Sequence, residues 1–228
     1  MKRFIFFDID GTLVLTDGAG KRALASAMEK SFDIESANTD IDYGGRTDLS
    51  ICKEIFNLNG VDFHPSEFNR FMDCYTSCLR TELQISAGTV LPGVKALLEH
   101  LQAEPQYALG LLTGNIRSGA YKKLEAHNLD SYFSFGGFGD RQELRPDIAK
   151  EGKQDAEKFA QKNLRPEEIL VIGDTPHDVT CSRAIGASVI AVCTGYSQRS
   201  AIEAEKPDLI LDDLSDLDAV LGHMDRLF

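Results

Sequence analysis

Short, continuous apolar runs alternate with helical patterns over most of the chain, and this alternation most narrows the folds it can adopt. The runs are rich in Val, Ile, Leu and Phe and lack the apolar–polar alternation of strands that expose one face to water. Strands buried on both faces belong to a parallel sheet covered by helices on each side. The sequence therefore predicts an α/β fold with a Rossmann-like, doubly wound parallel sheet. The predicted strands are residues 4–10, 107–113, 168–174, 187–195 and 207–213, with a short run at 132–135.

Residues 17–86 interrupt this alternation, because they contain three helical patterns with no strand between them. In the third pattern, apolar side chains from Phe68 to Leu83 recur at helical spacing, so one face is expected to be buried. The simplest account is an all-helical domain inserted after the first strand. We expect residues 1–16 and 87–228 to form the α/β core and residues 17–86 to form a helical cap, with glycines near both crossings that could permit a hinge.

The composition restricts the partners that such a chain can bind. Its formal net charge of −12 argues against a surface that follows nucleic-acid phosphates, which would be basic. No apolar stretch approaches the roughly 20 residues that a membrane-spanning helix needs. The five cysteines show no CxxC spacing, which favours reduced thiols and a cytoplasmic location. We therefore expect a small-molecule substrate, no nucleic-acid or membrane partner, and a monomer or homodimer.

Residues suited to chemistry lie at the ends of three predicted strands. In an open parallel sheet, ligands bind at the carboxyl ends of the strands, so these residues should converge on one small volume. Burying a carboxylate without a partner costs several kcal/mol, which makes two aspartates in the apolar first run a sign of function. The converging residues are Asp8, Asp10, Thr113, Gly114, Asn115, Asp174 and, one turn further on, Asp178.

The chemistry of these groups is complementary. Neighbouring carboxylates raise one another's pKa unless a cation neutralises them. Oxygen ligands suit Mg²⁺, which usually takes one or two protein carboxylates together with a phosphate. The Thr113 hydroxyl and the Asn115 amide could hold phosphoryl oxygens. One carboxylate could act as the nucleophile, and a second could protonate the leaving oxygen and later deprotonate the attacking water.

The stretches "DIDGTLV", "LLTGN" and "GDTPHD" resemble motifs one, two and four of the haloacid dehalogenase-like (HAD) hydrolase superfamily. The helical insert lies where that family's C1-type cap lies, and "LPGVKALLEHL" is similar to the segment after the cap in phosphoglycolate phosphatase-like members. The resemblance implies that Asp8 is the nucleophile and Asp10 the general acid/base. It also implies that Thr113 binds the transferring phosphoryl group, with Gly114 and Asn115 as further substrate contacts.

The same resemblance implies a magnesium site. Its ligands would be Asp8, the backbone carbonyl of Asp10, and Asp174, with Asp178 acting through water or behind the ligands. Dehalogenating members of the superfamily lack a second acid at the position of Asp10, so the resemblance points to phosphate chemistry.

Two further substrate contacts are expected. The family's third motif usually offers a lysine, often followed by proline, but residues 135–156 contain no Lys-Pro. A subset of the family has an Asp-Arg-x-Glu-Leu-like stretch with arginine in the position of that lysine. On this match Arg141 is the predicted residue, and Arg145, Lys150 and Lys153 are the alternatives. In the insert, "YGGRTD" gives an arginine, Arg46, that could reach a substrate carboxylate or phosphate; a solvated surface arginine is the alternative.

The predicted function is hydrolysis of a small phosphate monoester, with phosphoglycolate as one candidate, through a phosphorylated Asp8 and Mg²⁺. A phosphomutase of the same superfamily is the first alternative, because the first motif is common to both reactions. A non-catalytic regulatory or binding module on the same fold is the second alternative. It would be expected to have lost the nucleophile or a metal aspartate, and this sequence keeps them all.

Overall fold

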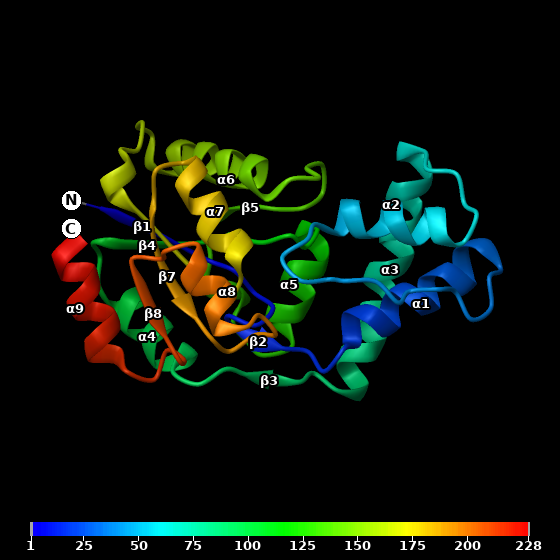
Figure 1. The fold of residues 1–228 in the computed structure, drawn as a ribbon, viewed down its shortest axis with the longest axis horizontal. Coiled ribbons are helices and arrows are strands. Elements are labelled where there is room, and N and C mark those ends of the chain that lie inside the picture. The colour runs from blue at the N-terminus through cyan, green and yellow to red at the C-terminus, as the bar shows by residue number, and fades with distance from the viewer. Residues whose placement is uncertain (1, 228) are drawn as a thin grey trace.

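The computed structural model describes residues 2–227, and a six-stranded parallel sheet forms the centre of its larger part (Figure 1). The strand order is β5-β4-β1-β6-β7-β8, and each neighbouring pair is parallel. The predicted Rossmann-like α/β fold is therefore confirmed. The strands are β1 (Arg3–Phe7), β4 (Tyr107–Leu112), β5 (Phe135–Gly137), β6 (Ile169–Gly173), β7 (Ser188–Val192) and β8 (Leu209–Leu211).

Helices cover both faces of this sheet, which explains why its strands are apolar throughout. The helices outside residues 17–86 are α4 (Val94–Ala103), α5 (Arg117–Glu125), α6 (Arg145–Ala160), α7 (Pro176–Ala184), α8 (Arg199–Ala204) and α9 (Leu217–Leu227). Two short 3₁₀ turns, η1 (Asp130–Tyr132) and η2 (Pro166–Glu168), precede β5 and β6. No helix among residues 2–227 is long and apolar enough to cross a membrane.

The side chains of β1 alternate between two apolar layers. Ile5 and Phe7 lie in the layer that contains side chains of α4, α5 and α9. Phe4 and Phe6 lie in the layer that contains side chains of α6 and α7. All four are fully buried. The core on both faces of the central strand therefore fixes where β1 ends, and with it the position of the aspartates that follow.

Residues 17–86 hold three helices, α1 (Ala19–Phe32), α2 (Asp48–Leu58) and α3 (Pro65–Ile85), which gather beyond α5 at one end of the molecule (Figure 1). We call them the helical segment. Its apolar side chains form a cluster of their own, joined from the rest of the chain by Ile116. At the start of α2, the N-cap residue Thr47 accepts a hydrogen bond from the Ser50 N–H at 3.1 Å. The apolar face predicted for α3 is buried.

The two crossings between the sheet region and the helical segment lie side by side. The short strands β2 (Val14–Leu15) and β3 (Thr89–Val90) pair in antiparallel fashion at this point. Gly88 adopts a φ of +79°, and a Cβ atom there would collide with the Leu15 carbonyl, so the approach of the two crossings requires glycine. The chain therefore enters and leaves the helical segment at one place.

Candidate active site

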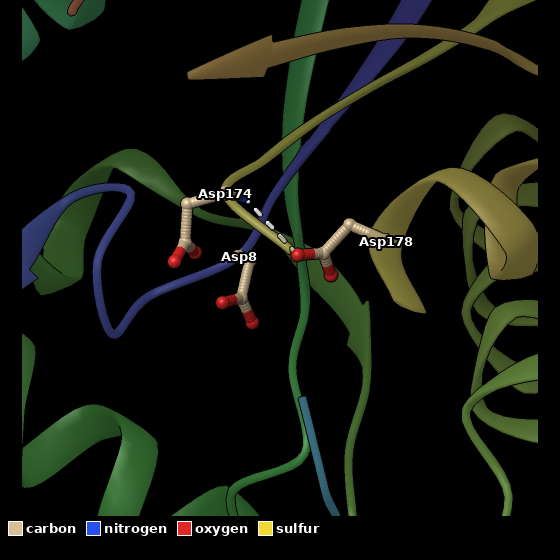
Figure 2. A group of neighbouring side chains, drawn as sticks. All are labelled: Asp8, Asp174 and Asp178. Atoms are coloured by element: carbon tan, nitrogen blue, oxygen red, sulfur yellow. Dashed lines mark hydrogen bonds between the residues drawn. The ribbon is translucent and has the colours of Figure 1, made fainter. Parts of the chain in front are cut away.

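The carboxyl ends of β1 and β6 and the start of α7 bring three aspartates together (Figure 2). Asp8, Asp174 and Asp178 each offer a carboxylate oxygen, and these oxygens lie within 4.8 Å of one another. All three side chains are buried. The convergence follows from the parallel register, because β1 pairs directly with β6 and the two strands end at the same edge of the sheet.

Asp174 is held against the loop that follows β1. The Thr12 hydroxyl donates to Asp174 Oδ1 at 2.9 Å. Gly11 has a φ of +87°, and a Cβ atom at Gly11 or at Gly195 would collide with the Asp174 carboxylate. The glycine and threonine of "DGT" therefore let the backbone approach this carboxylate and fix its orientation.

Asp178 takes part in capping the N-terminus of α7 and also faces the other two carboxylates. Its Oδ2 accepts hydrogen bonds from the Thr175 N–H at 3.0 Å and the Thr175 hydroxyl at 2.7 Å, while the Thr175 hydroxyl accepts from the Asp178 N–H. This reciprocal pattern is a capping box. The other oxygen, Oδ1, accepts from Arg145. The structure thus shows a cap role for Asp178 in addition to its place among the carboxylates.

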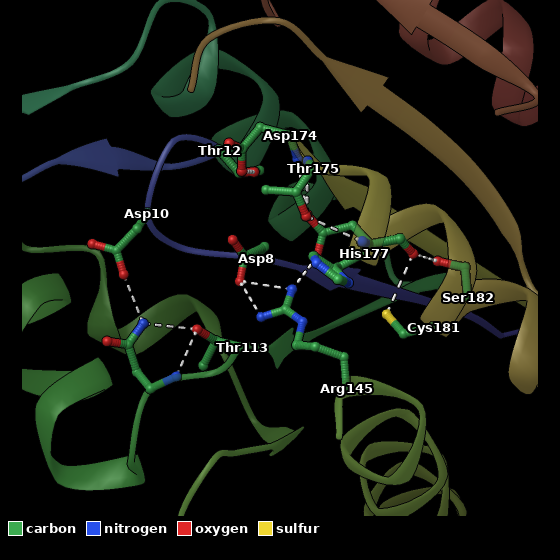
Figure 3. Close-up of polar contacts among 12 residues, drawn as sticks. Asp8, Asp10, Thr12, Thr113, Arg145, Asp174, Thr175, His177, Cys181 and Ser182 are labelled. Atoms are coloured by element: carbon green, nitrogen blue, oxygen red, sulfur yellow. Dashed lines mark hydrogen bonds and ion pairs between the residues drawn. The ribbon is translucent and has the colours of Figure 1, made fainter. Parts of the chain in front are cut away.

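Arg145, and not Arg141, is the basic residue that reaches the carboxylates (Figure 3). Its guanidinium donates to Asp8 Oδ1 at 3.3 Å from both terminal nitrogens, and it also pairs with Asp178. Arg141 is exposed. The reason is that α6 begins at Arg145, with Pro146 in its first turn, so that Arg141 lies outside the helix in the preceding loop. The Lys150 side chain points away to pair with Asp147, and Lys153 lies near Glu157.

Burial and mutual repulsion dominate the electrostatics of this cluster. Burial raises the pKa of Asp8 to about 7, opposed by Arg145 and reinforced by Asp178 and Asp10. Burial, followed by Asp178 and Asp8, also raises the pKa of Asp174 well above its usual value. Burial alone would lower the pKa of Arg145, but the Asp178 and Asp8 carboxylates outweigh it and raise that pKa. One guanidinium thus faces three buried carboxylates, which leaves negative charge for a cation to neutralise.

The donor set fits Mg²⁺ on chemical grounds. Every oxygen of the cluster belongs to a carboxylate, and hard divalent cations prefer such ligands. Burial and the neighbouring Asp178 and Asp8 carboxylates raise the pKa of Asp174, so they disfavour its charged form. A divalent cation between these carboxylates would compensate that charge.

Asp10 lies on the side of Asp8 away from Arg145 (Figure 3). Hydrogen bonds join it to Asn115 and Thr113 in a second group. The Asn115 amide donates to Asp10 Oδ2 at 2.7 Å and to Thr113 Oγ1 at 2.8 Å. The Asn115 N–H also donates to Thr113 Oγ1, at 3.3 Å. Because Thr113 Oγ1 accepts both bonds, its own hydroxyl hydrogen is left available to donate into the site. Lys123 of α5 contacts both oxygens of Asp10.

A cavity of about 460 Å³ joins both groups to the helical segment. Asp8, Asp10, Thr113, Gly114, Asn115, Arg145 and Asp174 line one part of it, and Leu24, Tyr43, Arg46, Asp48, Ile51 and Tyr75 line the part formed by the segment.

Arg46 lies in this cavity wall but is already paired. Its guanidinium donates to Glu54 Oε2 at 2.5 Å and to the Asp42 and Ser50 carbonyls at 3.1 Å each. To bind a substrate anion, Arg46 would share or exchange these partners.

Two buried residues near the cavity were absent from the sequence-based prediction. Asp48 accepts a hydrogen bond from the Ile116 N–H at 2.8 Å, and its own N–H donates to the Gly114 carbonyl at 2.7 Å. As an acid in the first turn of a helix, it gave no signal beyond an ordinary helix start. Lys123 did offer a signal, because it lies three residues after Ala120 and one before Leu124, both fully buried, on the inner face of α5.

Comparison with known proteins agrees with this geometry. Residues 5–192 match the family model described as haloacid dehalogenase-like hydrolase. A pyrophosphatase PpaX of Bacillus cereus is 31% identical over 223 residues, which cover 97% of this chain and 97% of the relative. A phosphoglycolate phosphatase of Synechococcus elongatus is 31% identical over 217 residues, covering 93% and 94%. The crystal structure of a β-phosphoglucomutase from Clostridium difficile shares the fold, with a TM-score of 0.74 at 16% identity and coverage of 99% and 98%.

Proposed function

We propose that this chain, which belongs to the haloacid dehalogenase-like hydrolase family, is a Mg²⁺-dependent phosphatase that hydrolyses a small phosphate monoester through a phosphorylated Asp8. The observation that carries the proposal is the cluster of Asp8, Asp174 and Asp178, whose carboxylate oxygens lie within 4.8 Å of one another. Asp10 and Thr113 line the same cavity as Asp8 and Asp174. We also infer a cytoplasmic location, which the free state of the five cysteines supports.

The ion would be held by Asp8, the backbone carbonyl of Asp10, and Asp174. Asp178 would lie next to these ligands without binding the ion directly. When bound, Mg²⁺ would neutralise the crowded carboxylates and the charge on the phosphoryl oxygens. Asp178 would act chiefly by orientation, because Thr175 and Arg145 already occupy its oxygens. Thr12 and Gly11 would keep Asp174 in place.

Asp8 would act as the nucleophile in the first half of the reaction. One of its carboxylate oxygens attacks phosphorus, the bond from phosphorus to the ester oxygen breaks, and Asp10 gives its proton to that departing oxygen. In the second half, Asp10 takes a proton from a water molecule as that water attacks phosphorus, and the bond from phosphorus to the Asp8 oxygen breaks so that the Asp8 carboxylate is restored. Inorganic phosphate leaves, and Asp8 and Asp10 return to their starting states.

Thr113 and Arg145 would bind the phosphoryl group during both halves. The Thr113 hydroxyl can donate to a phosphoryl oxygen because its oxygen is the acceptor in both hydrogen bonds with Asn115, which leaves its hydrogen available. Arg145 would provide a planar, fixed donor in place of the lysine of the family's third motif. Its position beside Asp8 supports this assignment over Arg141. Such positioning and charge neutralisation supply most of the catalysis in phosphoryl transfer.

The helical segment would act as a cap that closes over the ester. Its side chains complete the cavity wall opposite the aspartates. The paired crossings, with glycines of positive φ at Gly18 and Gly88, would be the hinge. Closure would exclude water from the bound ester and then admit one water molecule for the second half of the reaction.

The test is a screen of phosphate compounds with purified protein and added Mg²⁺, measured as release of inorganic phosphate. Phosphoglycolate and pyrophosphate enter the panel because relatives are named for them, alongside sugar phosphates and nucleotides. We expect turnover of at least one monoester, and a loss of several orders of magnitude in Asp8→Asn with an unchanged circular dichroism spectrum. Near-normal rates in that variant would rule out Asp8 as the nucleophile.

The same screen separates the phosphatase from a phosphomutase and from a non-catalytic module. A mutase would interconvert sugar-phosphate isomers and release little inorganic phosphate. A binding module would turn over no compound in the panel. Either result would contradict the proposed function.

A further inference from the structure

Lys123 is a buried lysine whose ammonium group is fully engaged at the candidate active site. Its Nζ donates to Asp10 Oδ1 at 2.7 Å, to Asp10 Oδ2 at 2.6 Å and to Asn115 Oδ1 at 2.7 Å. An ammonium group has three donors, so these contacts use them all. The Lys123 side chain is 6% exposed, whereas that of Asp10 is 41% exposed. The lysine therefore holds Asp10 from the buried side, while the exposed part of the Asp10 side chain lines the cavity.

Asn115 completes a closed ring with these two residues. Its carbonyl oxygen accepts from Lys123, and its amide nitrogen donates to Asp10 and to Thr113. The lysine thus fixes which end of the Asn115 amide points toward Asp10. Through that amide, the position of Thr113 is tied to the position of Asp10.

The helical segment seals Lys123 into this position. Gly119, one turn earlier on α5, lies against Tyr75 and Leu79 of α3, and a Cβ atom there would lie 3.4 Å from the Tyr75 ring. Gly20 of α1 lies between the Tyr75 hydroxyl and Lys123 Nζ, with its notional Cβ within 4.0 Å of each. The lysine is therefore enclosed where α5 meets the helical segment.

We propose that Lys123 is a positioning residue that holds Asp10 in place for its proton transfers and links that placement to the helical segment. The inference rests on the proposed function, in which Asp10 is the general acid/base. A general acid/base must lie within hydrogen-bond reach of the atom that it serves, and a displacement of about 1 Å can cost about 100-fold in rate. A buried ammonium is costly to desolvate, and Asp10 and Asn115 compensate that cost here.

The experiment is a double-mutant cycle on kcat and KM, measured with Mg²⁺ and the best monoester of the screen. Lys123→Met keeps the length and apolar stem of the side chain but removes the ammonium group. We expect it to lower kcat by about 100-fold and to change KM by less than about threefold. In the Asp10→Asn background, the same substitution should change kcat by less than about threefold, because the group that it positions is already inactive.

Lys122→Met is the matched control, because Lys122 is the adjacent residue on α5 and its ammonium pairs with Glu125. It should change kcat by less than about twofold. Lys123→Arg keeps a cationic donor and should retain at least about ten times the kcat of Lys123→Met. If Lys123→Met does not fold, the cycle is run with Lys123→Arg, whose smaller loss in kcat should likewise disappear beside Asp10→Asn.

Three outcomes would overturn the inference while leaving the phosphatase intact. They are a kcat unaffected by Lys123→Met, an equal loss of kcat with and without Asp10→Asn, and a rise in KM with kcat unchanged, which would make Lys123 a substrate-binding group. A wild-type protein that hydrolyses no ester at all would instead overturn the proposed function, and the inference with it.

Discussion

Replacing Asp48 by asparagine should remove a pH-dependent loss of stability that the wild-type protein carries. Asp48 is the first residue of α2, its side chain is buried, and it connects the helical segment to the loop after β4 through Ile116 and Gly114. Burial raises its pKa from 3.8 to about 6, although Lys123 and the Ile116 N–H oppose the rise. Asparagine keeps an oxygen that can accept the Ile116 hydrogen bond but does not titrate.

The sign and size of the effect follow from linkage. Between pH 3.8 and about 6, the folded protein keeps a proton on Asp48 that the unfolded chain releases, so unfolding free energy falls as pH rises through this window. The difference between the two pKa values corresponds to about 3 kcal/mol in full. Of this, about 1.4 kcal/mol is lost between about pH 5 and about pH 8.

Urea unfolding of both proteins at several pH values between about 5 and 8 measures this loss. The free energy of unfolding of Asp48→Asn minus that of the wild type should grow by about 1.4 kcal/mol toward the higher pH. Asp40→Asn is the control, because Asp40 lies in the helical segment with its side chain almost fully exposed, and its difference from wild type should stay constant. A flat difference for Asp48→Asn, or one that shrinks as pH rises, would refute the argument.

Three further predictions concern the cavity and the metal site. Gly11→Ala should lower the free energy of unfolding in urea by about 2 kcal/mol or more, because the new methyl group collides with Asp174 and the backbone keeps a positive φ. Gly60 also has a positive φ but lies in open space, so the control Gly60→Ala should lower that free energy by only about 1 kcal/mol. If Arg46 holds an anionic substrate, Arg46→Ala should raise KM about tenfold in steady-state kinetics. Glu54→Gln should lower KM, because it removes the carboxylate that pairs with the Arg46 guanidinium. The reverse changes in KM would exclude this contact. Mg²⁺ at about a hundred times its dissociation constant should raise the free energy of unfolding of the wild type in urea by about 2.7 kcal/mol. A chelator should remove this increase, and Asp174→Asn should show little of it, because Asp174 belongs to the carboxylate cluster.

The sheet and the main carboxylates could be predicted from the sequence because their signals are local. A continuous apolar run that is flanked by helical patterns indicates a strand buried on both faces, and residues directly after such strands meet at one edge of the sheet. Asp8, Asp10, Thr113 and Asp174 each follow a strand within three residues, so strand order alone brought them together.

Arg145, Lys123 and Asp48 could not be placed in this way. The choice between Arg141 and Arg145 depended on where α6 begins, and a shift of a few residues at a helix start decides which arginine faces Asp8. The spacing of Lys123 could place it on the inner face of α5, but its contact with Asp10 depends on tertiary packing that no local pattern specifies. Asp48 became buried only through contact between two parts of the chain about 68 residues apart.

Locating the phosphoryl group during turnover tests covalent catalysis by Asp8. The wild-type protein is mixed with its best substrate and Mg²⁺, quenched in acid during turnover, digested and analysed by mass spectrometry. We expect one phosphoryl group on the peptide that contains Asp8, located on Asp8 itself and missing in Asp8→Asn. Phosphate release at the full rate with no phosphorylated Asp8, or a phosphoryl group on another residue, would contradict covalent catalysis by Asp8.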